Sequence, residues 1–170
     1  MLLSIQHWDQ LDERKLMDLY GESDKENVDY FYPEAEDRAE ALCKVEEGFL
    51  TFLREDFFTK EKDTYWVLEE SGVYVSALRL TEVKERTFYL EALETHPEHR
   101  RRGCALRLFR EVFAALGEEG GFTIWDCVSK RNTASLRIHQ KAGFLIDADQ
   151  GKDLLRDEIR QGEYTMVYRS

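Results

Sequence analysis

The stretch from Thr87 to Phe109 constrains the fold more than any other part of the chain. An apolar strand is followed by a turn that Pro97 opens, and then by a helix that begins near Cys104. Apolar residues recur in this last segment at the three- and four-residue steps of an α-helix. They are Leu106, Phe109, Val112, Phe113 and Leu116.

The turn before this helix carries an unusual concentration of positive charge. Arg100, Arg101 and Arg102 stand where the helix begins, in a chain whose net charge is -11. A helix N-terminus already carries roughly half a positive charge, so these arginines are unfavourable there unless an anion binds. Free backbone N–H groups, the helix dipole and the guanidinium groups together suit a phosphate group. Gly103 and Ala105 keep the turn free of bulk, which lets the backbone approach such a ligand closely.

The order strand, Pro97, Arg100, Gly103 and Ala105 resembles the acetyl-CoA loop of the GNAT family of N-acetyltransferases. The resemblance implies that backbone N–H groups of this loop hold the pyrophosphate of coenzyme A, with acetyl-CoA as the acetyl donor. It also implies that the splayed end of the preceding strand pairs with the pantetheine arm of coenzyme A. The cofactor residues expected from these two segments are Leu93, Glu94, Thr95, Arg100, Arg101, Arg102, Gly103, Cys104 and Ala105.

Residues 129–144, with the sequence SKRNTASLRIHQKAGF, resemble a second stretch of the same family. Asn132 and Ser135 match its first half and are expected to contact the cofactor, with Asn132 also capping a helix. Gly143 matches its end and would stop that helix. His139 stands where the family commonly has a tyrosine that acts as an acid. His139 is therefore either a proton donor to the departing thiolate or a residue that caps or packs.

The rest of the chain predicts helices and strands in an order that resembles this family over nearly its whole length. A hairpin turn is expected at Ser71 and Gly72. The strands on either side of the arginine-turn helix should be parallel, because a helix connects them. The expected elements are a strand at 2–7, helices at 9–20 and 33–58, a hairpin within 64–83, strands at 87–95 and 121–128, a helix at 132–141, and strands at 144–146 and 163–168.

Two segments between these elements are expected to lack long regular structure. Gly21 is interpreted as a helix stop, so residues 21–33 should form an ordered loop. Residues 147–162 should form a loop or a short helix. The fold class is α/β (α+β), with one domain over residues 1–170. We expect a mixed, mostly antiparallel central sheet of about six to seven strands, flanked by about four helices.

Acetyl transfer to an amine needs a group that takes a proton from the amine. Strict alternation places Glu91 with Leu93 on one face of their strand and Glu94 on the other face. Glu91 lies just before the expected splay. It is either the base, directly or through water, or one half of a buried ion pair with Arg79.

The acceptor is expected to be a primary amine of a small molecule or a peptide. Substrate contacts are expected from Glu46, Tyr74 and Arg79, because the first helices and a strand hairpin form the acceptor walls in this family. Glu46 interrupts the apolar face of the helix at 33–58, which includes Ala39 and Cys43. It either faces the cleft or lies at the edge of that face with its carboxylate in water.

Composition excludes several other classes of protein. Asp and Glu outnumber Lys and Arg by 35 to 24, which argues against a nucleic-acid partner. The N-terminal residues are too polar for a signal peptide, and no apolar run is long enough to span a membrane. Cys43, Cys104 and Cys127 lack C-x-x-C spacing, which indicates reduced thiols in a cytoplasmic protein. No metal site is expected, and a homodimer is compatible with the resemblance.

The leading hypothesis is an acetyl-CoA-dependent N-acetyltransferase that works by direct transfer to an amine. Two rival functions remain. The chain could bind coenzyme A without catalysis, as a regulatory or interaction module, because His139 departs from the commonest pattern of the family. It could also be an interaction protein of the same fold whose arginine turn binds another anion.

Overall fold

The computed structural model describes residues 1–170. It contains a seven-stranded sheet in the order β1-β2-β3-β4-β5-β9-β6 and a separate two-stranded hairpin, β7-β8. The strands are β1 (Leu2–Ile5), β2 (Asp63–Glu70), β3 (Val73–Lys84), β4 (Thr87–Thr95), β5 (Thr123–Ser129), β6 (Leu145–Ala148), β7 (Gly151–Asp153), β8 (Glu158–Arg160) and β9 (Glu163–Arg169). The helices are α1 (Glu13–Phe31), α2 (Arg38–Glu55), α3 (Cys104–Gly117) and α4 (Thr133–Ala142).

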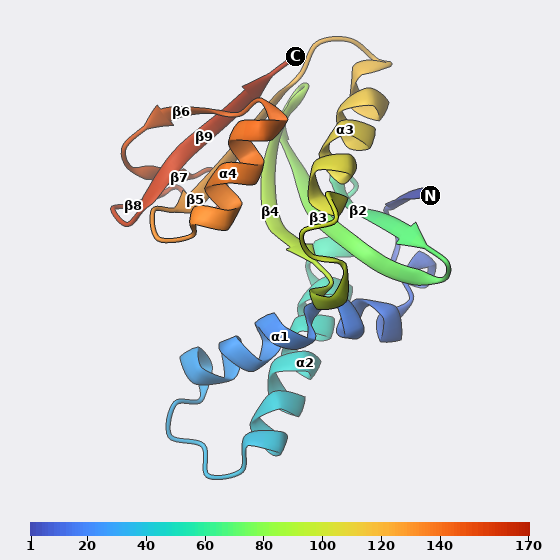
Figure 1. Cartoon of the computed structure of the whole chain (residues 1–170), viewed down its shortest axis with the longest axis vertical. Helices are drawn as coiled ribbons and strands as arrows, with labels where there is room; N and C mark the ends of the chain where they lie inside the picture. The colour runs from blue at the N-terminus through green and yellow to red at the C-terminus, as the bar shows by residue number, and fades with distance from the viewer.

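The large sheet forms the middle of three layers (Figure 1). On one face, Leu16 and Leu19 of α1 and Leu53 of α2 pack in one apolar cluster with residues of β2 and β3. On the other face, Leu108 and Phe109 of α3 pack with the opposite side chains of the sheet. α4 lies beside α3 on this second face. The predicted fold class is confirmed.

The strand pairings follow the sequence signals closely. Ser71 and Gly72 both have positive φ, 49° and 84°, as the two-residue turn between β2 and β3 requires. β4 and β5 are parallel, as predicted, and α3 connects them. They pair only at Thr87–Tyr89 and Thr123–Trp125. Beyond Tyr89 the two strands separate, and β4 loses its neighbour on that edge.

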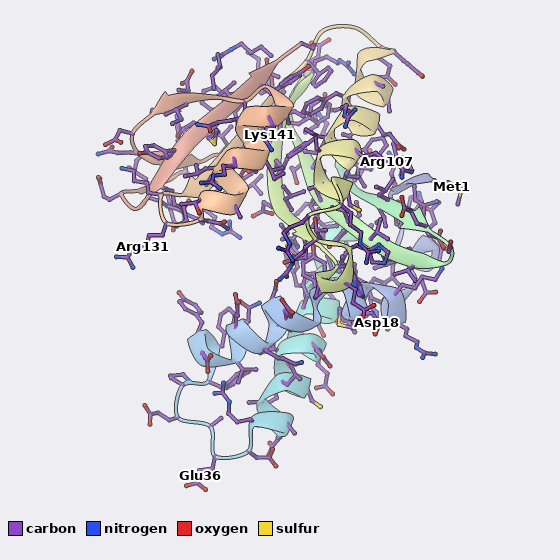
Figure 2. The ribbon with its side chains drawn as sticks, in the orientation of Figure 1. Met1, Asp18, Glu36, Arg107, Arg131 and Lys141 are labelled. Atoms are coloured by element: carbon purple, nitrogen blue, oxygen red, sulfur yellow. The ribbon has the colours of Figure 1, made fainter.

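Helix α1 is longer than predicted. It continues through Gly21 and ends at Phe31, where a loop was expected. Glycine in a helix interior costs roughly 1 kcal/mol relative to alanine, which tertiary packing outweighs here. Val28, in the second half of α1, packs with Ala41 and Val45 of α2. The two helices therefore form a hairpin whose connecting turn, at Glu36, lies far from the sheet (Figure 2).

Helix α2 begins later than predicted, at Arg38, because Asp37 caps it. The Asp37 carboxylate accepts hydrogen bonds from two main-chain N–H groups of the first turn, at 2.9 and 3.0 Å. The buried face differs from the predicted one, since Ala39 and Cys43 are exposed. Its buried residues are Ala41, Val45 and Leu53.

The hairpin of β7 and β8 replaces the loop or short helix predicted for residues 147–162. Fully buried Asp153 organises it by pairing with Arg156 at 2.8 Å and with Arg160 at 2.6 Å. The Asp153 carboxylate also accepts hydrogen bonds from the N–H groups of Leu155 and Arg156. Short polar strands give no apolar alternation, so the sequence pattern could not reveal this hairpin.

Strand β4 is interrupted by a bulge at Ala92. This residue has a φ of 54°, which non-glycine residues rarely adopt. The pairing of β3 with β4 shifts at the same place. The Tyr20 hydroxyl donates a hydrogen bond to the Ala92 carbonyl at 2.9 Å, and the Tyr65 hydroxyl donates to the Tyr20 hydroxyl at 2.6 Å. Burial raises the pKa of Tyr65 to about 12 and also raises that of Tyr20, so both hydroxyls keep the protons that they donate.

Candidate active site

The N-terminus of α3 has the geometry of an anion site. Its N-cap, Gly103, has a left-handed φ of 81°, and Arg101 has a φ of 58°. Left-handed residues in such a turn aim neighbouring N–H groups to one side. No side chain caps the helix, and its first bonded N–H group is that of Arg107, which donates to the Gly103 carbonyl at 2.9 Å. The N–H groups of the first turn are therefore available to a ligand.

A cavity of about 470 Å³ opens beside this end of α3. It is lined by Glu70, Arg102, Gly103, Cys104, Arg107, Arg110 and Glu111. Arg107, marked in Figure 2, pairs with Glu70 and, at 2.7 Å, with Glu111. Three arginines against two glutamates leave an excess of positive charge. A cavity of this size and charge suits the phosphates of coenzyme A.

Cys104 lies within this loop but is a packed residue. Its side chain joins the apolar cluster on the α3 face of the sheet, and the residue is 7 % exposed. Burial raises the pKa of its thiol, which disfavours the reactive thiolate.

Arg100 does not line that cavity. Its guanidinium group pairs with Glu22 of α1 and with Glu94 of β4, at 3.5 Å in the second case. Its Nε donates to the Thr95 carbonyl at 3.2 Å. Arg100 thus connects α1 with the end of β4, whereas Arg102 faces the cavity.

The bulge at Ala92 changes the faces of β4. Strict alternation predicts Glu91 and Glu94 on opposite faces, and this prediction is wrong. Glu94 accepts a hydrogen bond from Ser23 of α1, and Glu91 pairs with Arg79, which lies over aromatic rings of the α2 side. Both glutamates therefore face α1 and α2. Leu93 packs on the α3 side instead.

Glu91 lies between two arginines. Its carboxylate is 3.8 Å from the guanidinium group of Arg79 and 3.3 Å from that of Arg156 in the turn of the β7-β8 hairpin. The Glu91 side chain is 18 % exposed. The ion pair with Arg79, one of the two interpretations open from the sequence, is present, and Arg156 adds a contact that the sequence did not indicate.

His139 is turned into the core beneath α4. It is 1 % exposed and lies between the rings of Phe109 and Phe144. Its Nδ1 is 2.8 Å from the Ser135 carbonyl, and its Nε2 is 2.7 Å from a carboxylate oxygen of Asp126. Both ring nitrogens therefore face partners within the protein.

The pairing of His139 with Asp126 shifts the pKa of both groups. Burial by itself lowers the pKa of His139, but the Asp126 carboxylate and the Ser135 carbonyl raise it above the ordinary value of 6.5. Burial raises the pKa of Asp126, and His139 opposes that shift. The sequence did not single out Asp126. The pattern that could have indicated it is the alternation along β5: Asp126 lies two residues from both Ile124 and Val128, so its carboxylate falls on the buried face of the strand.

Between α1, α2 and β4, the carboxylates of Glu46 and Glu94 lie close enough to Asp24 to act on its charge. We call Asp24, Glu46 and Glu94 the carboxylate cluster. Asp24 is 2 % exposed, and burial together with Glu46 and Glu94 raises its pKa to about 6. Its Oδ2 atom has no hydrogen-bond partner. Because the sequence placed Asp24 in a loop, only Glu46 and Glu94 were predicted as site residues, and with separate roles.

The other predicted site residues lie apart from this cluster. Asn132 caps α4 by accepting a hydrogen bond from the N–H group of Ser135 at 3.0 Å. Tyr74 is buried against α1, where its hydroxyl accepts from the N–H group of Asp12 at 3.2 Å. No group of three or more His, Cys, Asp and Glu side chains is arranged to hold a metal ion. No helix combines the length and the apolar character needed to cross a membrane.

Comparison of the sequence with known families gives one relevant match. A sequence model of the acetyltransferase (GNAT) family matches residues 14–144, which is most of the chain. No curated protein matches significantly.

Several solved structures have a similar fold. The PaiA N-acetyltransferase of Thermoplasma acidophilum, crystallised with coenzyme A, is 11% identical, with a TM-score of 0.65 over 100% of this chain and 99% of that chain. The spermidine N-acetyltransferase of Vibrio cholerae, crystallised with coenzyme A and spermine, is 14% identical, with a TM-score of 0.61 over 99% and 95%. An aminoglycoside 6'-acetyltransferase of type Ii is 13% identical, with a TM-score of 0.62 over 99% and 96%.

Sequence identities this low establish a shared fold, but not a shared substrate or shared site residues. The family match carries the assignment, and the uncapped start of α3 and the separation of β4 from β5 agree with it. The chain belongs to the acetyltransferase (GNAT) family, whose enzymes take the acetyl group from acetyl-CoA.

Proposed function

We propose that this protein transfers the acetyl group of acetyl-CoA to a primary amine of a small molecule or a peptide. The observation that carries the proposal is the uncapped N-terminus of α3, with its left-handed turn and its arginine-lined cavity, directly after a strand that has left its neighbour. The first feature suits a diphosphate, and the second leaves an unpaired strand edge for the amide groups of the pantetheine arm. The amine acceptor is supported by the spermine in the Vibrio cholerae structure.

Transfer would be direct, without an acetyl-enzyme intermediate. The amine nitrogen attacks the thioester carbonyl, the N–C bond forms, the C–S bond breaks, and the thiolate of coenzyme A leaves and takes up a proton. A covalent intermediate would need an activated nucleophile. Burial raises the pKa of both Cys104 at the start of α3 and Cys127 of β5, so neither thiol favours that role. These free thiols also support a reducing compartment such as the cytoplasm.

Two proton transfers accompany this reaction, and each has a candidate. Glu91, with its partly exposed carboxylate, would take the proton from the amine through water. The His139–Asp126 pair would supply a proton for the thiolate, because burial lowers the pKa of His139 but the hydrogen bond and charge of Asp126 outweigh it and raise that pKa.

A second function, coenzyme A binding without transfer, is favoured by one observation. Both ring nitrogens of His139 are engaged inside the core, so neither points freely toward a leaving group. Release of free thiol from acetyl-CoA, followed with a panel of primary amines, separates the two functions. Thiol release that depends on an amine supports the transferase. Calorimetric binding of coenzyme A without thiol release for any amine would leave only the binding module.

A further inference from the structure

The carboxylate cluster contains a buried charge that the protein itself does not neutralise. Asp24 is 2 % exposed, and its Oδ2 has no hydrogen-bond partner. The groups that act on it are Glu46, Glu94 and the amide of Asn27, none of which is a cation. A carboxylate in such surroundings destabilises the folded chain unless a positive charge reaches it. Its surroundings therefore suit a cation that the chain does not supply.

The one arginine that contacts the cluster does not complete it. Arg100 lies 3.5 Å from Glu94, at the cluster's edge. Its guanidinium group also pairs with Glu22, and its Nε donates to the Thr95 carbonyl. Its ion pairs are with Glu22 and Glu94, and neither Glu46 nor Asp24 pairs with it. Negative charge thus exceeds positive charge inside the cluster.

The cluster lies beside the place where transfer is proposed. Tyr20, one helical turn before Asp24, bonds the Ala92 carbonyl at the bulge of β4. Glu94, a cluster member, belongs to the segment of β4 that has no pairing with β5. The cluster is thus on the α1–α2 side of the same strand segment whose free edge faces the splay.

The chemistry of acetyl transfer indicates which kind of cation would bind at the carboxylate cluster. An amine nitrogen must be neutral when it attacks the thioester, so the reacting nitrogen does not need three carboxylates around it. A second ammonium group on the same molecule keeps its charge throughout the reaction. It would satisfy Asp24 and would hold the reacting end in place.

We propose that the preferred acceptor is an aliphatic diamine or polyamine whose non-reacting ammonium group binds between Asp24, Glu46 and Glu94. This inference rests on the proposed function, because it names the acceptor of the same site. It assigns Asp24 to acceptor binding, with Glu46 on α2 and Glu94 on β4 as the flanking ligands.

The test compares two amines with the same four-carbon chain, putrescine and butylamine, of which only putrescine carries a second ammonium group. Thiol release from acetyl-CoA should give a kcat/KM for putrescine about tenfold or more above that for butylamine, since only putrescine gains a charge-assisted contact to the carboxylates. Asp24→Asn should remove most of this preference by raising the KM for putrescine. The kcat/KM for butylamine, which has no second ammonium group, should fall much less.

The matched control is Asp18→Asn, which removes one negative charge from an exposed position of the same helix (Figure 2). It should keep the preference for putrescine, which separates a specific contact from the general attraction of an acidic protein. A melting temperature of Asp24→Asn at or above that of the wild type shows that the loss of preference does not come from unfolding.

A binding measurement tests the dication site independently of the proposed transferase activity. Calorimetry with coenzyme A present should show putrescine binding about tenfold tighter than butylamine, and Asp24→Asn should abolish the difference. Such binding without thiol release would refute the transferase and keep the dication site. Equal kcat/KM values and equal affinities for the two amines would overturn the dication site and leave the transferase intact.

Discussion

The hydroxyl of Tyr20 donates a hydrogen bond, 2.9 Å long, to the carbonyl of Ala92, the residue of β4 with a left-handed φ. This contact joins helix α1 to the bulge that places Glu91 and Glu94 on one face. The acceptor side of the proposed site therefore depends on a bond between residues 72 positions apart in the chain.

Tyr20→Phe should lower both stability and transfer. The change leaves the Ala92 carbonyl and the Tyr65 hydroxyl without their partner, which costs on the order of 1 to 3 kcal/mol for buried groups. Transfer to an amine should fall more than affinity for coenzyme A, because the bulge positions the acceptor face of β4. Denaturant unfolding and steady-state kinetics measure the two effects. Tyr30→Phe, which removes the hydroxyl of a 79 % exposed tyrosine on the same helix, should change neither.

Asp24→Asn should stabilise the protein at neutral pH. The native pKa of Asp24 is about 6 and its ordinary value is 3.8, so the native state holds this proton more tightly than the unfolded state. The stability that this proton contributes is complete below pH 3.8 and is lost as the pH rises through 6. Removing the charge should therefore raise the free energy of unfolding at pH 7.5 by on the order of 2 kcal/mol.

The pH dependence provides the control for that prediction. Wild type and Asp24→Asn should have similar melting temperatures near pH 4, and the variant should melt on the order of 5 °C higher at pH 7.5. A constant difference across this range would mean that the charge of Asp24 is not the cause. A variant less stable at pH 7.5 would mean that a group of the protein already neutralises this carboxylate.

The features of the fold that the sequence predicts are those determined by residues close to one another in the chain. The β2-β3 turn, the parallel pairing of β4 with β5 and the start of α3 are encoded by neighbouring residues: Ser71 and Gly72, a crossover helix, and Gly103. Local periodicity and turn chemistry suffice for such features.

The carboxylate cluster and the bulge could not be predicted in this way. α1 continues past Gly21 because Val28 packs on α2, and Ala92 adopts a glycine-like φ because Tyr20 holds its carbonyl. Both causes are tertiary contacts that leave no local pattern. Because the sequence predicts a loop at Asp24, it does not predict that this residue lies close to Glu46 and Glu94.

The His139–Asp126 pair should contribute to stability most strongly at low pH. Because the native pKa of His139 is raised above 6.5, its contribution is complete below that pH and is lost as the pH rises through the native pKa. His139→Gln should destabilise the protein by on the order of 3 kcal/mol at pH 6, since it leaves Asp126 buried without a charged partner. The difference from wild type should shrink toward pH 9. His99→Gln should show no such trend.

Glu91→Gln should lower kcat while the Kd for coenzyme A stays the same, because the change removes the proposed proton acceptor and keeps the shape of the side chain. A decrease of about tenfold to a hundredfold is expected for a base that acts through water. Glu85→Gln, at an exposed position of the β3-β4 turn, is the matched control. Unchanged turnover in Glu91→Gln would reduce Glu91 to a structural partner of Arg79 and Arg156.

Affinity for coenzyme A, measured by calorimetry in wild type, Gly103→Ala, Arg102→Glu and the exposed control Arg14→Glu, tests the diphosphate site at α3 most directly. Alanine at a φ of 81° strains the turn that aims the N–H groups, and glutamate reverses a charge in the cavity. Each of these two variants should bind coenzyme A at least about tenfold more weakly than wild type, with Arg14→Glu unchanged. Equal affinities in all four proteins, or no binding by the wild type, would contradict the assignment of this helix end to the cofactor.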